Sequence, residues 1–178
     1  PLAAWLPQYS SGARLHLIGW TLGPTSTSAA AAYTYTAEKA AADAFSFDNP
    51  ENLLIFPSGD QGAKGGLSSL AWSAGCKNGI SVGASSMRLG LEDSLDGGRT
   101  RVAPFSALGP LPDGRFGVDL VAPGDGVLAA LVTAANTTAT TYSTTDWSAV
   151  GEQRSTGAAA GVIAGGALLV RQYLRNTS

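Results

Sequence analysis

Two adjacent hydroxyl side chains, Ser155 and Thr156, stand at the start of an uncharged stretch that covers residues 156–170. A serine or threonine hydroxyl can attack a carbonyl carbon when a base removes its proton, and a helix N-terminus can stabilise the resulting oxyanion. His16 is the only histidine in the chain and therefore the only candidate for an imidazole base. We favour the simpler interpretation, in which Ser155 caps the following helix and His16 is a structural or surface residue.

The composition argues against several classes of function. The 178 residues carry a net charge of −2 without a lysine- or arginine-rich run, which argues against nucleic acid as a partner. One cysteine, Cys76, and one histidine exclude an internal disulfide framework and zinc sites with several Cys and His ligands. Charged residues are only 13% of the chain. This low fraction reflects a bias toward alanine, and it also indicates that much of the chain lies inside a larger protein or assembly. The start at Pro1, without a methionine or signal segment, predicts a processed chain or a piece of a longer one.

Strand-like and helix-like segments alternate along the sequence. Apolar runs predict strands over 15–20, 53–56, 80–84 and 118–122, the last ending at Pro123-Gly124. Helices are predicted over 29–47, with a stop at Asp48-Asn49-Pro50, and over 156–175, while 89–100 and 134–145 are predicted as exposed loops or a hairpin. The apolar runs lack alternation and a helix separates the first two, so we expect an α/β fold with a parallel sheet covered on both faces. No linker divides the chain, so residues 1–178 are expected to form part of one domain.

The uncharged stretch over 156–170 also permits a membrane interpretation. Arg154 and Arg171 flank it, and Gly157, Gly161 and Gly165 give the spacing of small residues seen in packed membrane helices. A membrane span needs about 20 apolar residues, and this stretch is shorter and rich in alanine. We therefore expect a buried helix of a globular protein rather than a membrane span.

Five short sequence motifs follow one another along the chain. They are Arg14–Trp20, Ile55–Gly62, Lys77–Ala84, Phe105–Gly124 and Ser155–Gly165. In this order and at these distances they resemble the later half of the catalytic domain of subtilisin-like serine proteases, most clearly over residues 14–175. The resemblance implies the family's three-layer fold, with a parallel sheet between helices, and a serine endopeptidase ancestry. The family's first half, which carries the catalytic Asp and His, has no counterpart in this sequence.

The resemblance also assigns positions in a catalytic site. Gly157 takes the place of the family's nucleophilic serine, with Ser155 and Thr156 as the nearest hydroxyls, and Asp60 takes the place of the asparagine that stabilises the oxyanion. An ionised carboxylate only accepts hydrogen bonds and would repel an oxyanion. Gly19, Trp20 and Thr21 replace the substrate-binding Ser-Trp-Gly. Calcium sites are common in the family, but no residues here match one, so no cofactor or metal is predicted.

These substitutions lead to a first hypothesis, a subtilisin-like homologue that is catalytically inactive and binds peptides or acts as a scaffold. The alternative is an active endopeptidase whose Asp and His lie upstream and whose nucleophile is Ser155 or Thr156. A membrane-associated interaction protein is a third possibility. The expected partners are a peptide or protein substrate and the upstream half of the same domain. The glycosylation patterns at Asn136 and Asn176 favour a secretory protein.

Overall fold

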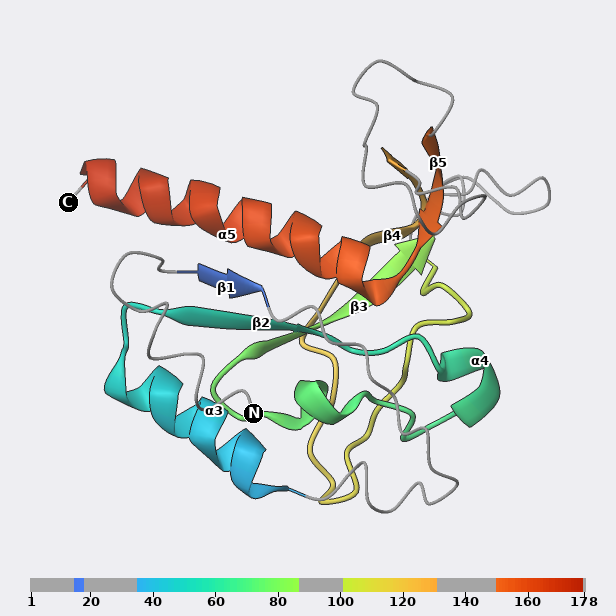
Figure 1. Cartoon of the computed structure of the whole chain (residues 1–178), viewed down its shortest axis with the longest axis horizontal. Helices are drawn as coiled ribbons and strands as arrows, with labels where there is room; N and C mark the ends of the chain where they lie inside the picture. The colour runs from blue at the N-terminus through green and yellow to red at the C-terminus, as the bar shows by residue number, and fades with distance from the viewer. Residues whose placement is uncertain (1–14, 18–34, 87–100, 131–149, 178) are drawn as a thin grey trace, which may run out of the picture.

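A computed structural model of the chain describes residues 15–17, 35–86, 101–130 and 150–177, which form a sheet between helices (Figure 1). The sheet has five strands in the order β1-β2-β3-β4-β5. They are β1 (Leu15–Leu17), β2 (Leu53–Pro57), β3 (Ile80–Ser86), β4 (Leu120–Ala130) and β5 (Val150–Arg154). The first four are parallel, and β5 runs antiparallel to β4.

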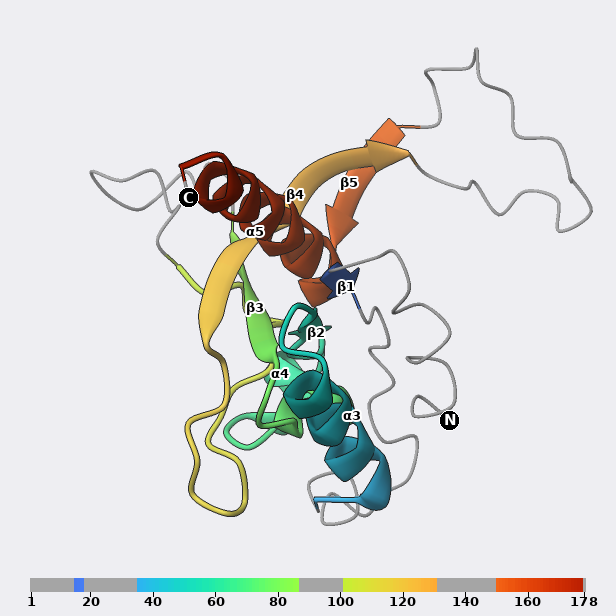
Figure 2. The same cartoon turned by 90° about the vertical axis from the view of Figure 1, so that its left-hand side faces the viewer.

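Helices lie on both faces of this sheet. The helical elements are α3 (Ala37–Asp48), α4 (Gly62–Gly65), the short 3-10 helix η1 (Trp72–Gly75) and α5 (Thr156–Thr177). In Figures 1 and 2, α5 crosses one face of the sheet and α3 lies against the other. The prediction of a three-layer α/β arrangement is therefore confirmed.

The alternation of side chains along β2 explains the two layers. Ile55 belongs to the core cluster under α5, whereas Leu54 and Phe56 belong to the cluster under α3. The cluster under α5 consists largely of small residues of the sheet, the helix and the loop before β4, namely Val82, Ala84, Ala103, Ala122, Ala159, Ala160 and Ala164. Because alanine adds little bulk, the start of α5 can pack closely on the strands. The many alanines of the sequence thus allow close packing between α5 and this face of the sheet.

Two carboxylates hold the strands and loops of the sheet together. Asp43 on α3 accepts hydrogen bonds from the backbone N–H groups of Lys77 and Asn78, at 2.7 and 2.8 Å, just before β3. Asp119 accepts from both the N–H and the hydroxyl of Ser81, each at 2.7 Å, where β4 begins beside β3. The bonds of Asp119 help to fix the register of β4 against β3.

The prediction that the fourth strand ends at Pro123-Gly124 was wrong. β4 continues to Ala130, and its register against β3 shifts so that Ser85 pairs with Pro123 and Ser86 with Asp125. Gly124 is the extra residue of this bulge, which absorbs the proline and glycine without ending the strand. Beyond the bulge β4 pairs with β5, so the sheet is mixed rather than purely parallel.

Most of the other predicted elements agree where the structure describes them, although β4 begins at Leu120 rather than at residue 118. Strands over 53–56 and 80–84 and the helix over 156–175 are confirmed, and Asn49 is the C-cap of α3. The predicted helix over 29–47 begins too early, because Thr36 is the extended N-cap of α3, which starts at Ala37; residues 29–34 are outside the described part. The same holds for residues 18–20 of the first strand and for the predicted loops over 89–100 and 134–145.

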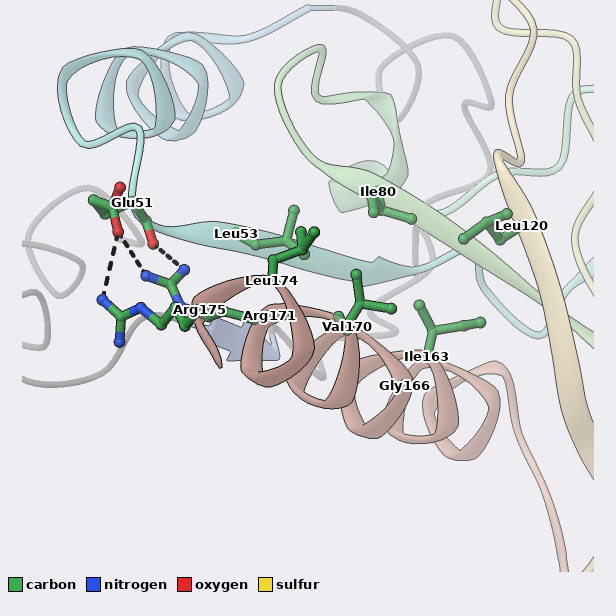
Figure 3. Close-up of a pocket in the computed structure, with 11 residues that line it drawn as sticks. Glu51, Leu53, Ile80, Leu120, Ile163, Gly166, Val170, Arg171, Leu174 and Arg175 are labelled. Carbon is green, nitrogen blue, oxygen red and sulfur yellow. Dashed lines mark hydrogen bonds and ion pairs between the residues drawn. The ribbon is translucent and has the colours of Figure 1, made fainter. Parts of the chain in front are cut away.

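α5 is buried over its first half only. Thr156, Ala159, Ala160 and Ala164 are buried, while large apolar residues of its second half, including Leu169 and Tyr173, are exposed. The expectation of a buried helix is thus wrong for the second half of α5, whose large apolar side chains are exposed although this half runs beside the starts of β2, β3 and β4 (Figure 3). By length and composition α5 would suffice to cross a membrane, and only 17% of its 18-residue apolar window is buried; one such helix does not by itself establish a membrane span.

Candidate functional site

The N-terminus of α5 meets the loop that follows β2. This contact joins two segments that are 96 residues apart in the sequence, around Asp60 and Thr156. The backbone N–H of Ser155 donates to the carbonyl oxygen of Gly124 at 2.9 Å, so the turn from β5 into α5 is anchored on the bulge of β4. The end of β2, the bulge and the start of α5 therefore form one compact junction.

Ser155 is the N-cap of α5, as the sequence predicted. Its Oγ accepts a hydrogen bond from the N–H of Gly157 at 2.9 Å. This bond satisfies one of the free donors in the first turn of the helix. The Ser155 hydroxyl oxygen therefore serves as an acceptor for the first turn of α5.

Thr156 is the most constrained residue of the junction. Its side chain is completely buried, and its Oγ1 donates to Asp60 Oδ1 at 2.8 Å while accepting from the N–H of Gly59 at 3.1 Å. The backbone N–H of Thr156 donates to the same Asp60 oxygen at 2.7 Å. Asp60 thus acts as a second cap of α5, and a carboxylate at the positive end of a helix is stabilising.

Gly157 follows in the first turn of α5 and is half-buried. Within the described part of the chain, a Cβ atom built at this position would meet only Ser155 Oγ, at 3.1 Å. A small side chain would therefore fit with a slight movement of that hydroxyl. Steric crowding does not require glycine here, so the absence of a hydroxyl at this position is not imposed by packing.

The structure brings together four of the predicted site residues, Asp60, Ser155, Thr156 and Gly157. His16 lies on β1, in register with Leu54 of β2. Gly19, Trp20 and Thr21 lie outside the described residues, so the substrate-binding prediction stays a prediction.

An ion pair beside the junction, between a buried carboxylate and a half-exposed arginine, was missed in the sequence. The Asp125 side chain is only 3% exposed, and its Oδ1 lies 2.8 Å from Nε of Arg154, the residue before the N-cap. Ser86 donates to Asp125 Oδ2 at 3.2 Å, and the Arg154 guanidinium lies over the ring of Phe105, 5.7 Å from its centre. Arginine compensates the buried carboxylate, which would otherwise be strongly destabilising. The two residues are 29 positions apart in the sequence and lie on antiparallel strands, so no local sequence pattern predicts their pairing.

Among the residues that the structure describes, no group of three or more His, Cys, Asp or Glu side chains could hold a metal ion. The carboxylates of the junction already have protein partners. Asp60 accepts from Thr156 and Asp125 pairs with Arg154. The arrangement is that of a helix start fixed by carboxylate and hydroxyl groups.

Cys76 lies outside this junction, next to α3 and β2, and packs against the cluster of Leu54 and Phe56. Burial raises the pKa of its thiol from 9.0 to about 12, so at pH 8 the thiolate fraction should fall by about 1,000-fold. We expect a thiol reagent at pH 8 to modify the folded protein far more slowly than the same protein unfolded in guanidinium chloride. Equal rates in the two states would contradict this burial.

Comparison with known proteins gives one clear match. The model of the Peptidase_S8 family, described as the subtilase family, matches residues 6–178. No curated protein matches the chain significantly. The family match covers nearly the whole sequence, including every residue of the junction between β2, β4 and α5.

Proposed function

The chain belongs to the subtilase family, and we propose that it is a subtilisin-like peptidase homologue without serine-dependent hydrolysis, which binds peptide or protein segments and does not cleave them. The observation that carries the proposal is Gly157 in the first turn of α5, at the position that the family resemblance assigns to the nucleophile. Glycine has no side-chain atom that could attack a carbonyl. The space around this position supports a specific loss of the hydroxyl rather than a rebuilt site.

The neighbouring hydroxyls are poor replacements for a nucleophile. Thr156 Oγ1 is completely buried and has both a donor and an acceptor partner within the protein. Ser155 Oγ is engaged by the N–H of Gly157. Recruiting either one would break the caps that hold the start of α5, which supports inactivity over the alternative of a shifted nucleophile.

The charge at the junction also opposes acyl-transfer chemistry. A tetrahedral intermediate needs hydrogen-bond donors aimed at its oxyanion. Asp60 presents a carboxylate instead, and this carboxylate already occupies the N–H of Thr156. One donor of the helix start is thereby unavailable to a substrate, and a negative charge stands in its place.

A serine-directed fluorophosphonate probe tests the proposal on the full-length protein. We expect no covalent labelling at Ser155 or Thr156 and no release of product from a casein substrate. Labelling at either residue, located by peptide mapping, would establish the active endopeptidase instead.

A matched variant shows whether residue 157 is accessible to a reagent in solution. We expect the Gly157→Cys variant to react with a small maleimide at residue 157, because the added side chain meets only Ser155 Oγ. A reactive cysteine next to unlabelled hydroxyls would mean that these hydroxyls are accessible but not activated. An unreactive one would mean that the junction is closed to reagents, which equally excludes hydrolysis there.

A further inference from the structure

A single Asn-Gly pair, Asn78-Gly79, lies in the bend between η1 and β3. In such a pair the backbone nitrogen of the second residue can attack the side-chain amide of the first and close a five-membered imide. Glycine favours this ring closure because it has no Cβ atom to hinder the approach of its nitrogen. Asn78 is exposed and Gly79 is half-buried, so the water and hydroxide that the reaction needs can reach the pair.

Packing requires the glycine of this pair. A Cβ atom at residue 79 would lie 2.5 Å from Cε2 of Phe56 and 3.1 Å from the carbonyl oxygen of Leu54. Phe56 is 1% exposed and belongs to the core cluster under α3, so its ring cannot easily move aside. A larger residue, which would slow imide formation, is therefore incompatible with the start of β3. The reactive pair is built into the fold.

Asn78 also ties the bend to α3. Its N–H donates to Oδ1 of Asp43 at 2.8 Å, and its Nδ2 donates to the carbonyl oxygen of Asp43 at 2.9 Å. The bond from Nδ2 restrains the side chain, but it lies at an exposed residue, where hydrogen bonds open readily. The Nδ2 atom is the one that imide formation releases as ammonia. Each modified molecule therefore loses one hydrogen bond between α3 and the start of β3.

The products of the reaction disturb the same contact. Aspartate and isoaspartate carry a carboxylate at residue 78, which cannot donate to the carbonyl oxygen of Asp43. The Asp43 carboxylate cannot turn away from the added negative charge, because Tyr35 donates to its Oδ2 at 2.5 Å and two N–H groups of the bend donate to its Oδ1. Isoaspartate also inserts a methylene group into the main chain, two residues before Ile80 begins the pairing of β3 with β2.

We propose that Asn78 is a modification site, which passes through a succinimide to aspartate or isoaspartate and thereby loosens α3 from β3. The Gly79 nitrogen loses its proton to hydroxide and forms a bond to Cγ of Asn78. The bond from Cγ to Nδ2 breaks, and this nitrogen takes a proton from water and leaves as ammonia. Water then adds to one of the two imide carbonyl groups and opens the ring. The reaction uses no oxidant or cofactor, and it is independent of the junction at the start of α5 and of any proteolytic activity.

Peptide mapping by mass spectrometry tests the proposal on the full-length protein after incubation in mildly alkaline buffer. We expect a mass gain of about 1 Da in the peptide that contains residue 78, and labelling of the same peptide by an isoaspartate-specific methyltransferase. Asn49 and Asn52 are internal controls, because Pro50 has no N–H to close the ring and the Leu53 side chain hinders ring closure. Both should stay unmodified over the same period.

A matched variant and a stability measurement complete the test. Asn78→Gln keeps an amide but would have to close a six-membered ring, so it should show no mass gain. The modified wild-type protein, separated from the unmodified form by ion exchange, should unfold at a lower urea concentration, because it lacks the Nδ2 bond and carries the added charge.

Three outcomes would overturn the proposal. The first is an unmodified residue 78 in the folded protein under conditions that modify the unfolded chain. The second is an equal mass gain in the peptide that contains Asn52. The third is a modified protein with the urea midpoint of the unmodified one, which would mean that the reaction leaves the contact between α3 and β3 intact.

Discussion

Replacing Gly124 with alanine is expected to destabilise the protein by about 3 kcal/mol. A Cβ at this position would lie 2.7 Å from Ala84 Cβ, 2.7 Å from the carbonyl oxygen of Ser155 and 3.1 Å from Ala159 Cβ. Two of these neighbours are held by the strand and by the N-cap of α5, so they cannot move aside as the end of a flexible side chain can. The helix start would have to shift from the sheet, which would also weaken the bond from the Ser155 N–H to the Gly124 carbonyl.

Urea unfolding followed by circular dichroism measures this effect as a lower midpoint with an unchanged slope. The control is Gly161→Ala on α5, where an added Cβ meets nothing within 4 Å. That variant should be as stable as the wild type or more stable, by up to about 1 kcal/mol, because alanine favours the helix. If Gly124→Ala and Gly161→Ala had the same stability, close packing at the bulge would not be what holds α5 on the sheet.

The parts of the fold that were predicted correctly are those determined by local sequence. The run over Leu53–Phe56 is apolar on both sides because α5 packs on one face of β2 and α3 on the other. The last helix is marked by an uncharged stretch and an N-cap serine directly before it. In each case the residues that define the element lie within the element, so a single sequence is enough to find it.

The parts that were predicted incorrectly depend on contacts between distant residues. Pro123-Gly124 has the composition of a strand end, yet the register shift against Ser85 and Ser86 allows β4 to continue. β5 was not predicted, because its five residues gain their partner only when the extended β4 lies beside them. The exposed second half of α5 has the same origin, since its exposure depends on how the helix packs on distant strands, which the sequence does not state.

The candidate site shows the same division. The N-cap role of Ser155 follows from its place before the helix, and the structure bears it out. The proximity of Asp60 to the start of α5 was accessible only through the resemblance of the chain to a family with a known site. The hydrogen bonds that Asp60 makes with Thr156, and the pairing of Asp125 with Arg154, depend on tertiary geometry that no spacing in the sequence encodes.

Removing the carboxylate of Asp60 is the second change with a large expected effect. Asp60→Ala should destabilise the protein by about 2–3 kcal/mol, because it leaves the N–H and the hydroxyl of a completely buried Thr156 without their acceptor. Asp60→Asn should cost about 1 kcal/mol, because an amide oxygen can still accept both bonds but lacks the charge that strengthens them at a helix N-terminus. The free energy of unfolding of the two variants, measured in urea, gives the comparison.

Substitutions at Thr156 test the same contact from the other side. Thr156→Val keeps the shape of the side chain but removes the hydroxyl that links Gly59 to Asp60, so it should lose about 1–2 kcal/mol. Thr156→Ser keeps the hydroxyl and should lose less than the valine variant, despite the missing methyl group. In the double variant Asp60→Ala, Thr156→Val the losses should be clearly less than additive, since both changes break one shared hydrogen bond. Strict additivity would mean that the two side chains stabilise α5 independently, which would contradict the hydrogen bond between Thr156 Oγ1 and Asp60.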